Sequence, residues 1–371
     1  MQTKMKELMI TVIGAGPSGN YFAYLLSKKG YKVQVFEENS RIGVPVQCTG
    51  LISEEINRIA RPPRECILNR IKKARIISPG KVEARVELKE NIVVDRAAFD
   101  LSLSEKAALE GAEYYLSTRF EKLERAGRGY LLRMRGKGQS TFRSDYVIGA
   151  DGPLSTVAKE AGMYGNRKFF TGMQITAKYS NSNEIEFHLQ KGGISWIVPI
   201  DEESARIGVA FEKDANKEFN AFLKKVFGDK YRKKASEKKV AGLIPKFSPF
   251  QRVEKRSIFL LGDAATQVKA TTMGGIVPGM KAAEALSAAI QGGASYTIRY
   301  LAKVFPDLYA SFVVRRIIDR CSPDEIDRLV TLMGEKKVKD VLLANSRDRM
   351  LPLGLKAMAN EPKLLYFLKR I

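Results

Sequence analysis

The sequence predicts an α/β protein in which a parallel-sheet nucleotide-binding domain is interrupted by an inserted mixed β-sheet and followed by a helical region. Three observations lead to this fold class. A glycine-rich turn near residue 14 joins an apolar run to a helical pattern, and segments with Gly beside Asp recur near residues 151 and 262. Short β-branched runs between residues 169 and 211 are typical of a separate sheet.

The glycine-rich turn, Gly14-Ala15-Gly16-Pro17-Ser18-Gly19, follows residues 8–13, an apolar and β-branched run typical of a buried parallel strand. Glycines permit a tight turn, and the helix expected at residues 18–29 directs free N–H groups and the positive end of its dipole at a pyrophosphate. The next strand, residues 32–36, ends at Glu37, which lies 37 − 14 = 23 positions after Gly14. In dinucleotide sites a carboxylate about 20 positions on binds the adenosine ribose. The segment therefore predicts a Rossmann-like dinucleotide site, and either NAD or FAD satisfies it.

The segment near residue 262 distinguishes the two cofactors. Residues 257–261 form an expected buried strand that ends at Gly262-Asp263. A carboxylate at this position can accept a hydrogen bond from a hydroxyl of a polyol chain. FAD has such a chain, the ribityl group, and NAD lacks one. Gly274-Gly275 precede an Ala-rich helix, expected at residues 276–290, whose N-terminus stabilises the negative charge of a reduced flavin. These features predict FAD.

Two further stretches carry a resemblance to a known family. Val44-Pro45-Val46-Gln47-Cys48-Thr49-Gly50 is similar to a Cys-containing loop near the flavin, and Gly193-Ile194-Ser195-Trp196-Ile197-Val198-Pro199, followed by Gly208, is similar to a Tyr-x-Trp-x-Phe-Pro…Gly motif. With the glycine-rich turn, Asp151-Gly152 and Gly262-Asp263, they make the chain resemble the glutathione-reductase-type flavoproteins of the aromatic-hydroxylase branch, and within them the geranylgeranyl reductase family. The resemblance extends to about residue 290. Ile194 and Val198 replace the motif's Tyr and Phe. These two replacements bear on which substrate is bound more than on the type of reaction.

The resemblance implies the residues of an FAD site. Arg96, at the start of a helix expected to end near residue 110, reaches phosphate or flavin atoms with its donor fork; a solvated charge at a helix start is the alternative. Cys48 is the predicted catalytic residue: it shields the flavin, donates a proton or pairs with Cys321, and an inert buried thiol is the alternative. The expected cofactor-binding residues are Gly14, Ala15, Gly16, Pro17, Ser18, Gly19, Glu37, Cys48, Thr49, Arg96, Asp151, Gly152, Asp263, Gly275 and Ile276.

The substrate wall is expected in the strand at residues 194–200. The predicted substrate-binding residues are Trp196, Ile194, Val198 and Pro199, with Ile197 as a further candidate. Alternation lets only half of a strand's side chains face a ligand, and an ordinary sheet core is the alternative. The only histidine, His188, also falls in an expected strand and suits a surface or sheet position better than the role of a general acid.

Three functions remain open on the sequence. The resemblance implies an FAD-dependent reductase that saturates C=C bonds of geranylgeranyl chains in membrane lipids or their precursors, by hydride transfer from reduced flavin and protonation. A flavin-dependent monooxygenase of an aromatic or polyketide substrate shares the Asp151-Gly152 segment, and a non-catalytic membrane-surface FAD protein is the third. No second glycine-rich turn follows a strand, so reduced ferredoxin or transiently bound NAD(P)H is the expected electron donor.

The excess of basic over acidic residues limits which binding partners are expected. The chain has 371 residues with 63 basic and 41 acidic side chains, a formal net charge of +22. The basic residues are scattered and no nucleic-acid module is recognisable, which argues against nucleic acid and favours an acidic electron carrier or an anionic membrane surface; general solubility is the alternative. Three separated cysteines predict neither a disulfide framework nor a metal site. Without a signal peptide or a run of about 20 apolar residues, the protein is expected in the cytoplasm, peripheral on the inner face of the cell membrane.

The order of the motifs predicts a discontinuous FAD-binding domain (residues 1–60, 90–160 and 247–292), a substrate-binding cap (61–89 and 161–246) and a C-terminal helical region (293–371). In the last region, helices are expected at residues 300–320 and 323–343. A final amphipathic stretch, residues 353–371, is expected to be broken by Pro362 and either to lie in a membrane interface or to dock on the protein's own core.

Overall fold

The computed structural model describes residues 7–235 and 239–371. Its nucleotide-binding sheet has the strand order β16-β17-β10-β1-β2-β6, and every neighbouring pair is parallel except β16 and β17. Apolar, β-branched residues buried on both faces form its central strands, as expected for a parallel sheet. These strands are β1 (Met9–Ile13), β2 (Lys32–Phe36), β6 (Glu113–Tyr115), β10 (Tyr146–Gly149), β16 (Glu254–Lys255) and β17 (Ile258–Leu260).

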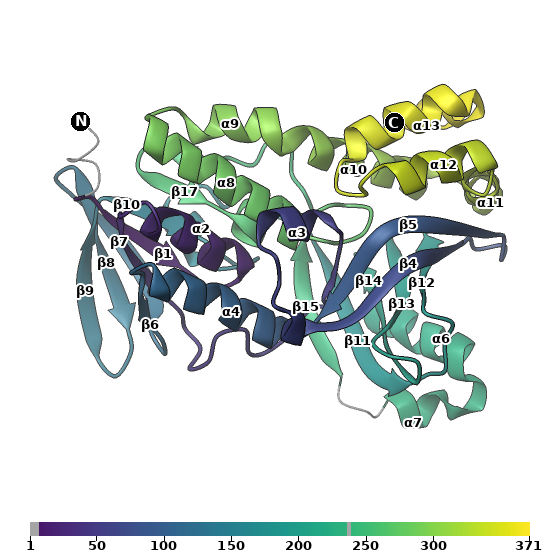
Figure 1. The fold of residues 1–371 in the computed structure, drawn as a ribbon, viewed down its shortest axis with the longest axis horizontal. Coiled ribbons are helices and arrows are strands. Elements are labelled where there is room, and N and C mark those ends of the chain that lie inside the picture. Colours follow the sequence, from purple (N-terminus) through teal and green to yellow (C-terminus); the bar gives the residue numbers. More distant parts are fainter. Residues whose placement is uncertain (1–6, 236–238) are drawn as a thin grey trace.

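Helices α2 (Pro17–Ser27), α4 (Arg96–Leu109) and α8 (Ile276–Gly292) pack together beside this sheet, and each begins near an expected site segment (Figure 1). A small antiparallel sheet packs against β1 and β10 and shares their core. Its strands are β7 (Arg119–Ala126), β8 (Gly129–Arg135) and β9 (Gln139–Ser144). Shorter elements of this part are α3 (Glu55–Ile59), η1 (Arg64–Cys66), α5 (Thr156–Glu160) and η3 (Gly262–Ala265). The α/β class and the Rossmann-like region are confirmed.

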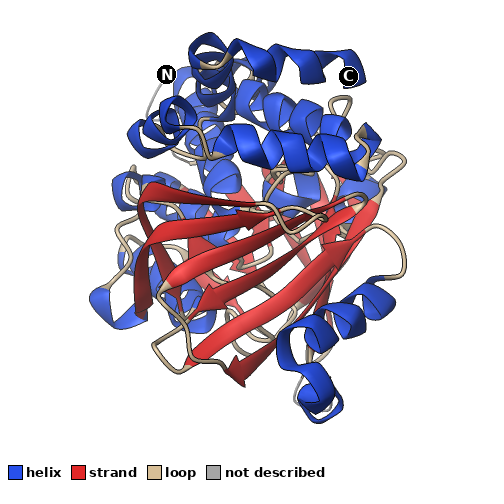
Figure 2. Ribbon diagram, turned by 90° about the vertical axis from the view of Figure 1, so that its right-hand side faces the viewer, coloured by secondary structure: helices blue, strands red, loops and turns tan. Residues whose placement is uncertain are grey.

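A second sheet, here called the cap sheet, has the order β15-β11-β14-β13-β12-β4-β5-β3 and is mixed, because β12 and β4 run parallel whereas the other pairs are antiparallel (Figure 2). The hairpin of β4 and β5 was not among the expected strands. It bends through register shifts, and charged residues interrupt its apolar pattern. The strands are β3 (Leu51–Ile52), β4 (Ile67–Ile77), β5 (Glu83–Val94), β11 (Phe169–Lys178), β12 (Glu184–Gln190), β13 (Gly193–Pro199), β14 (Ser204–Phe211) and β15 (Val240–Pro245).

The two faces of the cap sheet have different partners. On one face, Ile197 and Ile207 pack against Phe219 and Leu223 of α6 (Ala215–Phe227), followed by η2 (Gly228–Lys230) and α7 (Tyr231–Ala235). The other face carries a separate apolar cluster with Trp196 and turns toward the nucleotide-binding part. The cap sheet therefore has one structural face and one face that is free to line a site. The domain boundaries given above stay a prediction.

The C-terminal region is helical, but its expected long helices are each divided. The stretch at 300–320 is divided because Val304 leaves the helical conformation and Pro306 lies in the first turn of the next helix. The stretch at 323–343 is divided at Gly334 and Glu335, the latter extended. Pro362 separates the last two elements, as expected. The elements are α9 (Tyr296–Lys303), α10 (Phe305–Arg320), α11 (Pro323–Met333), α12 (Lys336–Ala344), α13 (Met350–Asn360) and η4 (Pro362–Arg370).

Across the described residues, none of the helices combines the length and the apolar character needed to cross a membrane.

Candidate active site

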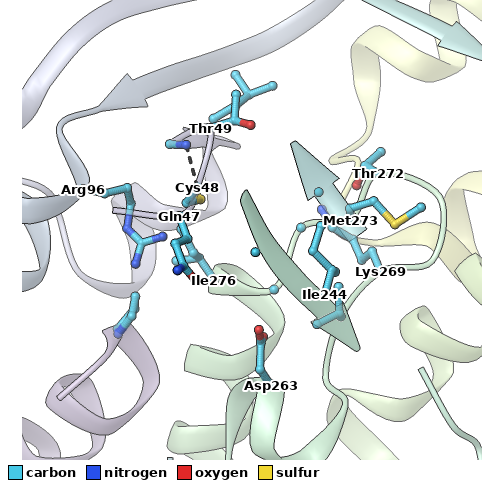
Figure 3. Close-up of a pocket in the computed structure, with 18 of the residues that line it drawn as sticks. Gln47, Cys48, Thr49, Arg96, Ile244, Asp263, Lys269, Thr272, Met273 and Ile276 are labelled. Carbon is cyan, nitrogen blue, oxygen red and sulfur yellow. Dashed lines mark hydrogen bonds between the residues drawn. The ribbon is translucent and has the colours of Figure 1, made fainter. Parts of the chain in front are cut away.

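Two adjoining cavities lie between the nucleotide-binding sheet and the cap sheet. The larger has a volume of about 450 Å³ and the smaller about 150 Å³, and Gly16, Gln47 and Arg96 line both. The smaller cavity reaches Glu37, and the larger one extends past Asp263 to the cap sheet. Together they bring the segments predicted from the sequence to one place, and Figure 3 shows part of the larger cavity with Arg96, Cys48 and Asp263.

The glycine-rich turn packs closely against the backbone of neighbouring segments. Gly14 has a φ of +102°, its N–H donates to the carbonyl of Phe36 at 2.8 Å, and a Cβ there would lie 2.3 Å from the carbonyl oxygen of Ala150. By contrast, a Cβ on Gly16 would have no atom within 4 Å, so the turn is open on the cavity side. No side chain caps the start of α2, which leaves its first N–H groups available to a phosphate.

Glu37 joins this turn to the smaller cavity. One carboxylate oxygen accepts from the N–H of Ala15 at 2.9 Å, and the other accepts from the backbone and side-chain amide groups of Asn39 at 2.9 and 2.7 Å. A carboxylate has about four lone-pair positions, so capacity remains for a ribose hydroxyl. The position fits the role predicted from the spacing.

Asp263 lies at the start of η3 and points into the larger cavity (Figure 3). Its carboxylate accepts no hydrogen bond from the residues described. Burial raises the pKa of Asp263 to about 6, although the guanidinium groups of Arg96 and Arg167 lower it. A buried acceptor without a donor, beside Gly275 at the start of α8, fits a hydroxyl-bearing chain. The arrangement therefore fits the ribityl chain of FAD.

Arg96 is not a solvated charge. Its side chain is only 13 % exposed, and it donates to both carboxylate oxygens of Asp100, at 3.1 and 2.8 Å. This fork fixes the guanidinium, which lies on the same side of the cavity as Cys48 (Figure 3).

Residues of the cap sheet hold the Cys48 loop. Gln174 of β11 donates to the carbonyl of Cys48 at 3.0 Å and accepts from the Thr49 hydroxyl at 3.0 Å. Arg206 of β14 donates to the carbonyl of Thr49 at 2.6 Å. The Sγ of Cys48 in turn accepts from the N–H of Gly50 at 3.3 Å. Sequence reasoning missed Gln174 and Arg206, since no local motif marks either residue.

The suggested pairing of Cys48 with Cys321 is wrong. All cysteines of the chain lie in the described part and are free. Cys321 is buried against Ile317, Ile326 and Phe367, in the C-terminal region.

The remaining predicted residues divide into those at the cavity and those behind it. Ala15, Pro17, Ser18, Thr49, Gly152 and Ile276 line one of the cavities, as do Ile194, Trp196 and Val198. Gly14, Gly19, Asp151 and Pro199 are not among the lining residues. Asp151 instead accepts from the hydroxyl of Ser155 at 2.5 Å and from the N–H of Val157 at 3.0 Å, so its carboxylate stabilises its own loop.

Alternation along β13 separates Ile197, which packs against α6, from the residues at the cavity. His188 is buried beside Phe222 of α6 and contacts Glu186 and Lys225, away from the cavity.

Comparison with known proteins gives the following matches. Residues 63–297 match the family model described as FAD binding domain, and residues 12–50 match that of the NAD(P)-binding Rossmann-like domain. The chain is 29% identical to digeranylgeranylglycerophospholipid reductase 3 of Methanosphaera stadtmanae, over 90% of this chain and 92% of that protein. It is also 29% identical to digeranylgeranylglycerophospholipid reductase of Methanocaldococcus jannaschii, over 88% and 90%.

Solved structures show the same fold. A geranylgeranyl bacteriochlorophyll reductase-like protein from Thermoplasma acidophilum superposes with a TM-score of 0.83 at 21% identity, covering 99% of this chain and 100% of that one. A probable FAD-dependent monooxygenase from Pseudomonas aeruginosa gives a TM-score of 0.68 at 18% identity, covering 88% and 100%. The fold is thus shared by both named activities and does not by itself distinguish them.

Proposed function

The chain belongs to the FAD-binding-domain family, and on that premise we propose that it saturates C=C bonds of geranylgeranyl chains in membrane lipids or their precursors. The family match spans residues 63–297, more than half of the 371 residues. FAD as cofactor, an FAD-dependent oxidoreductase and the resemblance to the geranylgeranyl reductases are confirmed. The names of the curated relatives support a prenyl-lipid substrate.

One observation carries the proposal: the cavity that reaches Asp263 and Gly275 continues directly onto an apolar wall made by Ile194, Trp196 and Val198. An isolated alkene is a poor hydride acceptor, so it needs close alignment and a site without water. Side chains on one face of a strand give such a wall.

The predicted residues have distinct tasks in this proposal. The first turn of α2 binds the pyrophosphate, Glu37 binds the adenosine ribose, and Asp263 accepts from the ribityl hydroxyls. Bound FAD, once reduced, supplies the hydride. Ile194, Trp196 and Val198 hold the isoprenoid chain and exclude water. Cys48, whose loop is held by Gln174 and Arg206, donates the proton or shields the flavin in this proposal.

The electron donor in this proposal is reduced ferredoxin or NAD(P)H, and the lipid is taken from an anionic membrane surface. Exposed apolar side chains of α13 and η4, with Leu355 at 56% and Leu365 at 49% exposure, lie among Lys356, Lys363 and Lys369. Apolar groups with interspersed lysines support contact with such a surface.

Single-turnover reoxidation tests the function. The purified flavoprotein is reduced by dithionite without oxygen, a geranylgeranyl lipid is added, and flavin absorbance and product mass are followed. We expect reoxidation together with a mass gain of one H₂ per reduced bond. Flavin that stays reduced until oxygen is admitted would instead favour a monooxygenase.

A further inference from the structure

One residue of the cavity wall, Met273, has a backbone conformation that residues with a side chain rarely adopt. Its φ is +57°, in the left-handed region where a Cβ crowds the following carbonyl oxygen and glycine is favoured. In the described part of the chain, the other non-glycine residues with such a φ are polar or charged, and all but Thr266 are exposed. Thr266 is buried, but its hydroxyl accepts from the N–H of Ser248 at 3.2 Å. Met273 is therefore the apolar member of this set, and the one that lines the larger cavity.

Hydrogen bonds of the loop between η3 and α8 fix this conformation. The N–H of Met273 donates to the carbonyl of Lys269 at 2.9 Å, and the N–H of Lys269 donates to the carbonyl of Gly274 at 3.1 Å. The loop is also anchored on α10, because the N–H of Thr271 donates to the hydroxyl of the fully buried Ser311 at 3.1 Å. A strained backbone persists only where its surroundings over-determine it, and such strain gathers at functional sites.

The side chain of Met273 packs where this loop meets the cap sheet. It lies against the apolar cluster that contains Trp196 of β13, and Ile244 of β15 packs against the same cluster. All three residues line the cavity. In Figure 3, Met273 and Ile244 lie across the cavity from Cys48. Met273 therefore closes the apolar part of the cavity from the side of the nucleotide-binding region.

The position favours glycine, yet it carries a large side chain. A glycine at residue 273 would adopt this φ without strain, and the next two residues, Gly274 and Gly275, are glycines. Methionine is unbranched, with several rotatable bonds and a polarisable sulfur, so it adapts to an apolar ligand of irregular outline. A prenyl chain, with a methyl branch on each isoprene unit, is such a ligand. What the strained backbone retains is the volume of this side chain in the cavity.

We propose that Met273 determines which C=C bond of the prenyl chain is reduced first, because its side chain limits how far the chain advances along the wall of Ile194, Trp196 and Val198. An isolated alkene reacts only when it is closely aligned, so a displacement of the chain along this wall changes which bond meets that condition. The inference rests on the proposed function, since the cavity must hold a prenyl chain. It gives Met273 a contact with the substrate and no part in the transfer of hydride or proton.

Single-turnover reduction of geranylgeraniol by the dithionite-reduced holoenzyme tests the proposal. The positional isomers of the product are resolved by gas chromatography and mass spectrometry, and we expect wild type to form one isomer predominantly. Met273→Gly and Met273→Ala should each lower the ratio of that isomer to the others at least about tenfold, the usual effect of losing a methylene-sized contact in an apolar pocket. Met273→Leu keeps most of the volume and should retain the ratio. The matched control is Met163→Ala, at a methionine buried in the core of the nucleotide-binding region, which should also retain it.

Thermal unfolding of the same variants tests the backbone argument separately. Met273→Gly and Met273→Ala both remove the methionine side chain, but alanine stays strained at a φ of +57° whereas glycine does not. Met273→Gly should therefore unfold at a higher temperature than Met273→Ala. Equal unfolding temperatures would overturn the inference that the side chain is retained against strain.

Failure of this inference and failure of the proposed function give different results. If wild type reduces geranylgeraniol and the variants at residue 273 form the same isomers in the same ratio, Met273 does not select the bond and the reductase function stands. A wild type that forms the isomers in equal amounts overturns the inference in the same way. If neither geranylgeraniol nor a digeranylgeranyl glycerophospholipid reoxidises the reduced wild type, the proposed function itself fails. Met273→Gly relieves strain, so the test stays decisive if Met273→Ala does not fold.

Discussion

At the scale of single residues, the environment of Asp263 in the cavity fits a hydroxyl-bearing ligand. Its carboxylate is buried, its pKa is raised to about 6, and no described donor contacts it. In the folded apoprotein this pKa lies above the value of an unfolded chain, so the group lowers stability above about pH 6 and ceases to do so as the pH falls toward about 4. In the proposed FAD site, a ribityl hydroxyl would donate to the ionised form and supply the missing hydrogen bond.

FAD affinity should therefore depend on pH through Asp263. Because binding favours the ionised carboxylate, the dissociation constant of FAD from the apoprotein should rise as the pH falls below about 6, by up to about tenfold per pH unit. Fluorescence titration of the apoprotein at about pH 7.5 and about pH 5 measures this. Asp263→Asn should bind FAD more weakly and with little pH dependence over the same range. A constant affinity in the wild type would contradict the assignment.

Gln174 gives a second prediction at this scale, because it holds the Cys48 loop through both ends of its amide. Gln174→Leu leaves the Cys48 carbonyl and the Thr49 hydroxyl without this partner, which should lower the free energy of unfolding by about 1–3 kcal/mol. It should also slow flavin reoxidation by the lipid about tenfold, because a small displacement of a reacting group is costly. Urea unfolding and single-turnover kinetics measure the two effects.

The matched control is Gln190→Leu, also in the cap sheet, where the side chain accepts only from the Ser195 hydroxyl. It should lose stability without losing rate. If both variants react equally fast, Gln174 has no part in positioning the loop.

Local sequence signals identified several residues that line the cavities, and their roles toward FAD stay a prediction. The glycine-rich turn, Glu37 and Asp263 each lie directly beside a strand end, so periodicity and spacing were enough to place them. Asp151 shares that local signature, yet its carboxylate is taken by Ser155 and Val157, which only the three-dimensional structure reveals. Arg206 and Arg347 reach the site from distant elements, and no spacing rule identifies such residues.

At the scale of elements, β13 has two faces with separate roles. Val198 lines the cavity, whereas Ile197 packs under α6. Val198→Phe should therefore fill the cavity and strongly slow lipid-dependent reoxidation, with FAD content unchanged. Ile197→Ala should lower the free energy of unfolding by about 2–5 kcal/mol with the reaction rate retained. Kinetics and urea unfolding on both variants check this, and a Val198→Phe protein as fast as wild type would refute the assigned wall.

The same alternation explains which elements the sequence predicts well. The strands between residues 169 and 211 were placed to within a residue or two, because their apolar runs are bounded by clear turns. Helix divisions were missed because Val304 carries no breaking signal and Pro306 is tolerated in a first turn. The β4–β5 hairpin was missed because its register shifts disturb the pattern that identifies strands.

At the scale of the whole molecule, the chain order of the segments explains why three distant motifs form one site. Parallel strands bring their carboxyl ends to the same edge of a sheet, so the turns after β1, β10 and β17 meet there. The cap sheet then covers this edge, and the C-terminal loop between α12 and α13 adds Arg347 and Asp348 to the wall. The last contribution was beyond sequence reasoning, since the family resemblance fades before residue 300.

The net charge of +22 belongs to the molecule as a whole and leads to the last prediction. An acidic electron carrier such as ferredoxin should be steered toward this surface, and salt screens such steering because the Debye length falls from about 10 Å at 0.1 M to about 3 Å at 1 M. Stopped-flow reduction by ferredoxin should therefore slow at least about tenfold over that range. Reoxidation by a neutral prenyl alcohol is the control and should change little. A ferredoxin rate that is insensitive to salt would instead favour NAD(P)H as the donor.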